Sequence, residues 1–219
     1  MNLKLKELKK RFRSRENGPA VESMNRMGLV YEKNYGVSIS ELLEIAKDYK
    51  YNSELSEFLW KQNIREAKII SLMICNPKEV SKLKIEVILQ GIDNIELTEQ
   101  ACINLLEKVE NIFPKIENWL KNDNKYYKIT GLFLISRIVK EKKELKNEEL
   151  LKFFNNFESI AKINNGLIEK SLAKALLQIG KKNIILETEV LSFIDKIKEK
   201  NYKSAAWLNE EVAYFLINK

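Results

Sequence analysis

The sequence predicts an all-α protein, an α-solenoid built from antiparallel helical hairpins. Helix breakers are rare, because Gly occurs 7 times and Pro 3 times in 219 residues, while Lys, Glu, Leu and Ile are abundant. No segment alternates apolar and polar residues over a useful length, which argues against strands. Small residues recur among aliphatic ones at about the length of a helical hairpin, which indicates structural repeats.

Five segments place one small residue amid aliphatic residues at helical spacing. The small side chain lets a neighbouring helix approach closely, so that each hairpin can stack on the next. The spacing predicts about six hairpins in a single curved domain over residues 1–219, and an irregular helical bundle is the alternative. The five positions, separated by 34, 30, 42 and 33 residues, are Ala67, Ala101, Gly131, Ala173 and Ala206.

Start and stop signals bound the predicted helices. Ser38 and Glu41 form a capping box that opens a helix over 41–49, and Ser53 is a candidate N-cap for 54–62. Proline disfavours a helical residue before it, so Asn76-Pro77 ends the preceding helix. The remaining signals are breaks at Gly91 and Asn94, Pro114 in the first turn of a helix with Ile116, Trp119 and Leu120, and Gly166 and Gly180 around 167–179.

Composition excludes several classes of chemistry. Hydrophobic residues make up 45% and charged residues 32%, as in a globular protein with a core, and no apolar run reaches the length of a membrane span. The absence of His removes the commonest general base and metal ligand. Cys75 and Cys102 lie in apolar helical patterns, so we expect buried thiols. We therefore expect no metal, no cofactor and, without the apolar core of a signal peptide, a cytoplasmic protein.

Basic side chains are concentrated at the N-terminus. Residues 1–15 carry seven basic side chains and one acidic one, a net charge of +6 within the chain's total of +7. A basic helix or arm of this kind is a candidate for phosphate contacts, and a solvated helix face is the alternative. Lysine dominates the basic residues, and lysine offers no bidentate fork to phosphates or base edges.

Several motifs occur in the order typical of one known family. They are Ser23-Met24-Asn25-Arg26-Met27 followed by Tyr35-Gly36-Val37-Ser38, then Leu59-Trp60 with Arg65-Glu66-Ala67, and later Trp119-Leu120-Lys121-Asn122-Asp123-Asn124. Together they resemble the HEAT-repeat DNA alkylation repair enzymes, the AlkD-like alkylpurine DNA glycosylases, over roughly residues 20–182. The resemblance implies a HEAT-like solenoid that binds duplex DNA along its concave face.

The resemblance also implies a reaction, hydrolysis of the N-glycosidic bond of N3- or N7-alkylated purines. Because the alkylated base already carries a positive charge, it leaves without a general acid. A carboxylate stabilises the developing oxocarbenium charge or orients water, and an indole face attracts the cationic nucleotide.

The reactive residues of the family motif are partly replaced in this chain. The family's Trp-Asp-x-x-Asp motif places its Trp at Ile95 and its final Asp at Glu99, and the family's Arg falls at Ile129. Lys128 is adjacent to Ile129 but lies about 100° around the helix, which makes it a poor substitute. Glu99 is therefore the one candidate catalytic residue, and we expect weak excision at most.

Candidate nucleic-acid contacts combine basic and aromatic residues. Tyr126 and Tyr127, beside Lys128, form an aromatic-basic cluster that could stack on a nucleotide, although tyrosines packed at a repeat edge are the commoner outcome. A further family aromatic is replaced by Lys174. The alternative function is a non-catalytic scaffold that binds a protein or a structured nucleic acid. The predicted DNA contacts are Lys9, Lys10, Arg11, Arg26, Tyr126, Tyr127, Lys128, Lys170 and Lys174.

Overall fold

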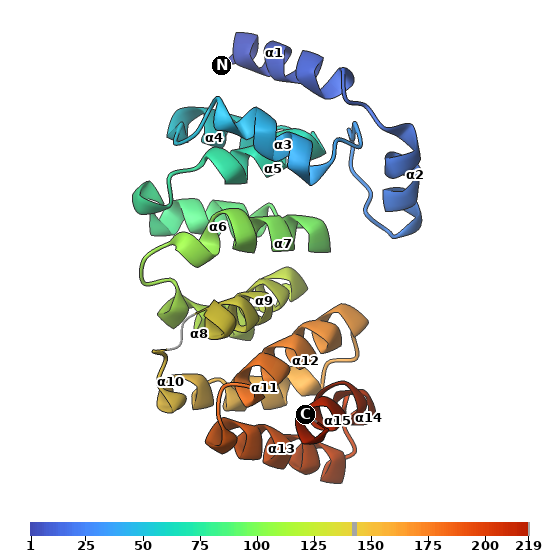
Figure 1. Cartoon of the computed structure of the whole chain (residues 1–219), viewed down its shortest axis with the longest axis vertical. Helices are drawn as coiled ribbons and strands as arrows, with labels where there is room; N and C mark the ends of the chain where they lie inside the picture. Colours follow the sequence, from blue (N-terminus) through green and yellow to red (C-terminus); the bar gives the residue numbers. More distant parts are fainter. Residues whose placement is uncertain (142–143, 219) are drawn as a thin grey trace. The chain divides into compact units, whose positions relative to one another are not determined.

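The computed structural model describes residues 1–141 and 144–218, and helices joined by turns and loops make up these ranges (Figure 1). Within these ranges there is no strand, only an isolated bridge between Lys33 and Ile64. The chain forms two compact units, Met1–Glu110 and Asn111–Lys219. The predicted all-α, solenoid-like class is confirmed, and the single curved domain stays a prediction.

Unit 1 contains seven α-helices and two short 3₁₀ turns among its described residues. Helices α3 and α4 pack against α5, and α5 packs against α7, so α5 lies at the centre of this unit. The elements are α1 (Asn2–Arg13), α2 (Gly18–Arg26), α3 (Ile39–Lys47), α4 (Ser53–Trp60), α5 (Arg65–Ile74), η1 (Pro77–Glu79), α6 (Lys82–Gln90), α7 (Ile95–Asn104) and η2 (Leu106–Lys108).

Unit 2 is organised around two long helices that pack on each other, α9 and α12. Helix α8 covers α9, while α11, α13 and the C-terminal turns contact α12. The elements are η3 (Phe113–Lys115), α8 (Ile116–Lys121), α9 (Lys125–Glu141), α10 (Asn147–Leu151), α11 (Phe154–Ala161), α12 (Gly166–Gly180), α13 (Ile184–Glu199), α14 (Ala205–Leu208), the π-helical turn η4 (Asn209–Ala213) and α15 (Tyr214–Ile217).

Most predicted helix boundaries follow from local caps. Ser38 and Glu41 form the predicted capping box of α3, and α5 ends before Pro77. Ser53 as an N-cap was wrong, because the side-chain carbonyl of Asn52 accepts from Leu55 N at 3.0 Å and starts α4 one residue earlier. The Ser53 hydroxyl donates instead to Glu79 at 2.9 Å.

The other predicted signals lie at or near element ends. Gly91 closes α6, Asn94 caps α7, and Gly166 and Gly180 are the first and last residues of α12. Pro114 occupies the 3₁₀ turn η3 directly before α8, rather than the first turn of that helix. A 3₁₀ turn at a helix start places proline where its missing N–H costs no hydrogen bond.

The small residues at the repeat positions have the predicted packing role in four cases. Ala67, Ala101 and Ala173 are buried, and a Cβ added to Gly131 would lie 3.0 Å from Leu120 of α8. The Leu120 side chain therefore occupies the space that a larger residue at position 131 would fill. Ala206 was assigned wrongly, because it is exposed and its neighbour Ala205 is the buried residue.

The basic N-terminal segment is a docked helix and not a free arm. Helix α1 buries Leu8 and Phe12, and the Phe12 ring lies 5.7 Å from that of Tyr35. Burial of two apolar side chains holds this helix in unit 1, so its lysines are presented from a fixed surface. Cys75 and Cys102 are buried and form no disulfide, as predicted.

None of the helices in the described part of the chain is both long enough and apolar enough to cross a membrane.

Candidate nucleic-acid interface

Helix α7 carries Glu99, the residue that the resemblance places at the final Asp of the family motif. Asn94 caps this helix by accepting from Leu97 N at 3.0 Å, and the helix begins at Ile95. Ile95 and Glu99 are four residues apart, so they share one face, and both are half-buried. Within the described residues Glu99 makes no hydrogen bond or ion pair. Its carboxylate is therefore accessible and uncommitted.

A buried ion network lies at the start of the same helix. Arg65 is 1% exposed and binds Glu96 through two hydrogen bonds, Nη2 to Oε1 at 2.6 Å and Nε to Oε2 at 2.8 Å. Its Nη1 donates to the Val37 carbonyl at 2.9 Å and to Glu66 Oε1 at 3.1 Å. The Arg-Glu pair of the sequence motif therefore has a structural role, because it ties α5, α7 and residues 31–37 together.

Two further groups complete this network. The Tyr31 hydroxyl donates to Glu96 Oε2 at 2.5 Å, and burial together with the charge of Glu96 raises the pKa of Tyr31 above its usual range. Glu66 Oε1 also accepts from the backbone N–H groups of Tyr35 and Val37, whereas its Oε2 is buried without a hydrogen-bond partner. Arg65 makes four hydrogen bonds within the protein and is 1% exposed, so its guanidinium is not accessible to a phosphate.

The remaining motif positions belong to unit 2. Ile129 is completely buried in α9, as its helical pattern predicted. Lys128 Nζ donates to the Asn122 carbonyl, so this lysine is engaged in its own loop. The residue that the resemblance places at the family's Arg is therefore a buried, uncharged side chain. Ile95 and Glu99 belong to unit 1 and Ile129 to unit 2.

The two adjacent tyrosines at the start of α9 differ in exposure. Tyr127 is 4% exposed, whereas Tyr126 is half-buried and has Lys125 Nζ at 4.9 Å from its ring centre. Stacking on a nucleotide needs an accessible ring face. The burial of Tyr127 therefore favours Tyr126 as the aromatic contact.

The basic residues of α1 and α2 fall into engaged and free groups. Arg11 pairs with Asp48 at 2.7 Å, and this hydrogen bond raises the pKa of Arg11. Lys10 and Arg26 are exposed, Lys9 is half-buried, and none of the three forms an ion pair within the described residues. A basic side chain without a carboxylate partner is available to bind an external anion. Lys9, Lys10 and Arg26 are therefore better candidates for DNA contacts than the paired Arg11.

Lys170 and Lys174 are brought together on α12. Both are exposed, and they line one pocket with Ala173, Leu177, Trp207 and Glu211. The Lys174 ammonium also lies 5.9 Å from the centre of the Phe133 ring. Sequence reasoning missed Trp207 as a site residue. The buried face of that helix, formed by Ala205 and Leu208, leaves Trp207 off it, and the sequence did not reveal this because the buried small residue was taken to be Ala206.

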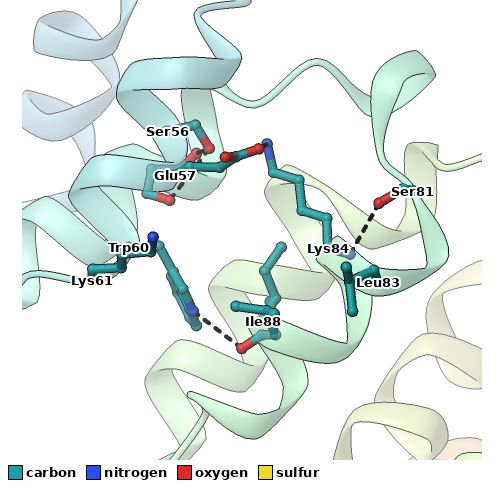
Figure 2. Close-up of a pocket in the computed structure, with 10 residues that line it drawn as sticks. Ser56, Glu57, Trp60, Lys61, Ser81, Leu83, Lys84 and Ile88 are labelled. Atoms are coloured by element: carbon teal, nitrogen blue, oxygen red, sulfur yellow. Dashed lines mark hydrogen bonds and ion pairs between the residues drawn. The ribbon is translucent and has the colours of Figure 1, made fainter.

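A second pocket, of about 220 Å³, lies between α4, α5 and α6 in unit 1 (Figure 2). Trp60 forms one wall and donates its indole N–H to the Val87 carbonyl at 3.3 Å. Glu57 and Lys84 pair across the opening at 3.4 Å, and the exposed Leu83 lies at its edge. Most of the surface that lines the pocket is apolar, and its one carboxylate, Glu57, is paired with Lys84.

Comparison with known proteins identifies relatives of this chain. The family model described as "DNA alkylation repair enzyme" matches residues 8–210. A solved structure described as "a new family of proteins related to the HEAT-like repeat DNA glycosylases with affinity for branched DNA structures" superposes with a TM-score of 0.77 and 13% sequence identity, covering 88% of this chain and 82% of that one. A search of curated protein sequences gives no match. The structural similarity shows a shared HEAT-like fold.

Proposed function

The chain belongs to the DNA alkylation repair enzyme family, and from this membership we propose that it binds duplex DNA and excises N3- or N7-alkylated purines weakly. The observation that carries the proposal is the family match over residues 8–210 combined with an accessible Glu99. The concave DNA-binding face that the resemblance implies stays a prediction.

Uncommitted cations on both units support binding to a polyanion. Unit 1 offers Lys9, Lys10 and Arg26, and unit 2 offers Lys170 and Lys174. Contacts between lysine ammonium groups and phosphates do not depend on base sequence, so binding is non-specific and salt-sensitive. The structural relative's described affinity for branched DNA is consistent with DNA as the ligand class.

Weak excision is consistent with what remains of the motif. An alkylated purine leaves as a neutral base once its bond to the sugar breaks, and the sugar then carries the positive charge. Glu99 offers a carboxylate to that charge or to the attacking water. Ile95 offers no π face, and the buried Ile129 offers no charge, so transition-state stabilisation is reduced.

The pocket in Figure 2 favours one alternative, a scaffold that binds a protein. Leu83 and Val87, at its edge, are 75% and 43% exposed, and apolar groups exposed beside a concave site are typical of interaction surfaces. This function does not involve Glu99 or the free lysines, so substitutions at those residues distinguish the two functions.

Salt titration of DNA affinity tests the proposal. Deletion of residues 2–15 would remove the basic side chains of α1, but it would also remove the buried Leu8 and Phe12. Replacing Lys6, Lys9, Lys10 and Arg13 by Gln leaves this core intact. The slope of log K against log salt should become shallower by about 0.9 for every phosphate that the variant no longer contacts, measured by fluorescence anisotropy with a duplex.

Lysines in local ion pairs provide the matched control. Lys47 pairs with Glu44 and Lys121 with Glu117, both at 2.6 Å. For each charge removed, converting these two lysines to Gln should change the slope less than the four-residue α1 variant does. Equal effects per charge would show that net charge alone governs binding, and the absence of salt-sensitive binding in the parent protein would contradict the proposed function.

A further inference from the structure

The pocket of unit 2 beside α12 combines three kinds of group that nucleotides bind. It has a volume of about 360 Å³, within the range of about 300–1,000 Å³ that is typical of small-ligand sites. Ala173 and Leu177 give it an apolar floor, Trp207 an aromatic wall, and Lys170 and Lys174 a positive edge. Helix α12 also contacts η4 and α15, so the elements around the pocket are packed on one another.

Trp207 differs from the other two tryptophans of the chain. Trp60 and Trp119 are 7% and 6% exposed, whereas Trp207 is half-buried. The Trp60 indole N–H donates a hydrogen bond to the Val87 carbonyl, but within the described residues Trp207 has no hydrogen-bond partner. Part of the indole surface and its N–H group are therefore available to a ligand.

The charges of the pocket fit a single phosphate. Lys170 and Lys174 are exposed and form no ion pair within the described ranges, and Glu211 is the one acidic residue that lines the pocket. The lining side chains therefore carry a net charge of +1. The two lysines are four residues apart on one helix face, so both ammonium groups can approach the same phosphate.

We propose that this pocket binds one unpaired nucleotide of a DNA strand, with the base stacked on Trp207 and its phosphate between Lys170 and Lys174. A base paired within a duplex presents only its edges, whereas an unpaired base presents a face to the indole. The inference rests on the proposed DNA binding and adds a preference for DNA with an unpaired nucleotide.

Affinity for two matched DNA molecules tests the proposal. One is a fully paired duplex, and the other is the same duplex with a single unpaired nucleotide. Trp207→Ala should weaken binding to the second by about 5- to 150-fold, because that is the effect of losing one base–aromatic stack. The affinity of Trp207→Ala for the paired duplex should equal that of the parent protein. The double variant Lys170→Gln/Lys174→Gln should flatten the salt slope for the DNA with the unpaired nucleotide.

An exposed aromatic elsewhere provides the matched control. Tyr51 is 57% exposed and has Lys50 Nζ 5.1 Å from its ring centre, but it lies in unit 1. Its φ is 61°, a conformation that Asn tolerates, so Tyr51→Asn removes the ring with little strain. This variant should bind both DNA molecules as the parent does.

Tryptophan emission gives a second readout that does not depend on the folding of Trp207→Ala. The unpaired nucleotide should quench parent emission, and the quenching should be absent in Trp207→Phe, since Trp60 and Trp119 are buried. Equal effects of Trp207→Ala on both DNA molecules, or quenching that persists in Trp207→Phe, would overturn the inference. Parent protein that binds the paired duplex without preferring the unpaired nucleotide overturns only this inference, whereas no DNA binding at all overturns the proposed function as well.

Discussion

Replacement of Arg65 by Met should destabilise unit 1 strongly. Arg65 is 1% exposed and makes four hydrogen bonds, two to Glu96, one to Glu66 and one to the Val37 carbonyl. Met fills a similar volume but leaves both carboxylates without their cation. Glu66 is completely buried and Glu96 is 14% exposed, so water cannot compensate fully.

The expected loss is about 3–5 kcal/mol of unfolding free energy, the usual cost of removing one partner from a buried ion pair. A domain of ordinary stability has about 5–15 kcal/mol in total, so the variant should unfold at much lower urea concentration. Urea titration followed by circular dichroism measures the difference. Lys121→Gln, which breaks the exposed pair with Glu117, should cost less than about 1 kcal/mol.

A double variant distinguishes an unpaired charge from poorer packing. Adding Glu96→Gln to Arg65→Met removes one of the two unpaired carboxylates, so part of the stability should return. A loss below about 1 kcal/mol for Arg65→Met would refute the reasoning, because it would mean that the network contributes no more than a surface pair.

Two further predictions concern backbone strain and pH. Gly36→Ala should cost at least about 2 kcal/mol in urea unfolding, because Gly36 has φ +70° and an added Cβ would lie 2.3 Å from the Asn17 carbonyl oxygen; an unchanged midpoint would contradict this. The hydrogen bonds from Lys196 and Lys200 hold the pKa of Glu158 at about 2, so the ionised group stabilises the fold above its ordinary unfolded pKa of about 4.3. That contribution is lost as pH falls toward 2, so the melting temperatures of the parent and Glu158→Gln should converge between about pH 5 and pH 2, and a constant difference would argue against it.

Local signals in the sequence predicted most of the fold. The capping box at Ser38 and the break at Asn94, where that residue caps α7, depend on hydrogen bonds within four residues, so the sequence contains all the groups they need. Asn52 and Ser53 are both good N-caps, and the sequence alone does not decide between them. Ala205 and Ala206 are equally small, so only the packed structure shows which one is buried.

The candidate site was less predictable because its contacts are long-range. Arg65 and Glu96 are 31 residues apart, and no periodic pattern predicts their pairing. Glu99 was identified through a family resemblance and not from its own chemistry. Trp207 shares a pocket with Lys170 and Lys174 because α12 packs on the C-terminal turns, a contact that the spacing of residues did not indicate.

Release of N7-methylguanine from alkylated duplex DNA under single-turnover conditions tests the proposed function most directly. Loss of one transition-state stabiliser costs roughly 10²–10³ in rate, and here both the aromatic and the Arg are replaced, by Ile95 and Ile129. We predict excision far slower than that of a family member with the full motif, and loss of most of the residual rate in Glu99→Gln. Fast release that persists in Glu99→Gln would contradict the proposal, because the reaction would then depend on groups other than Glu99.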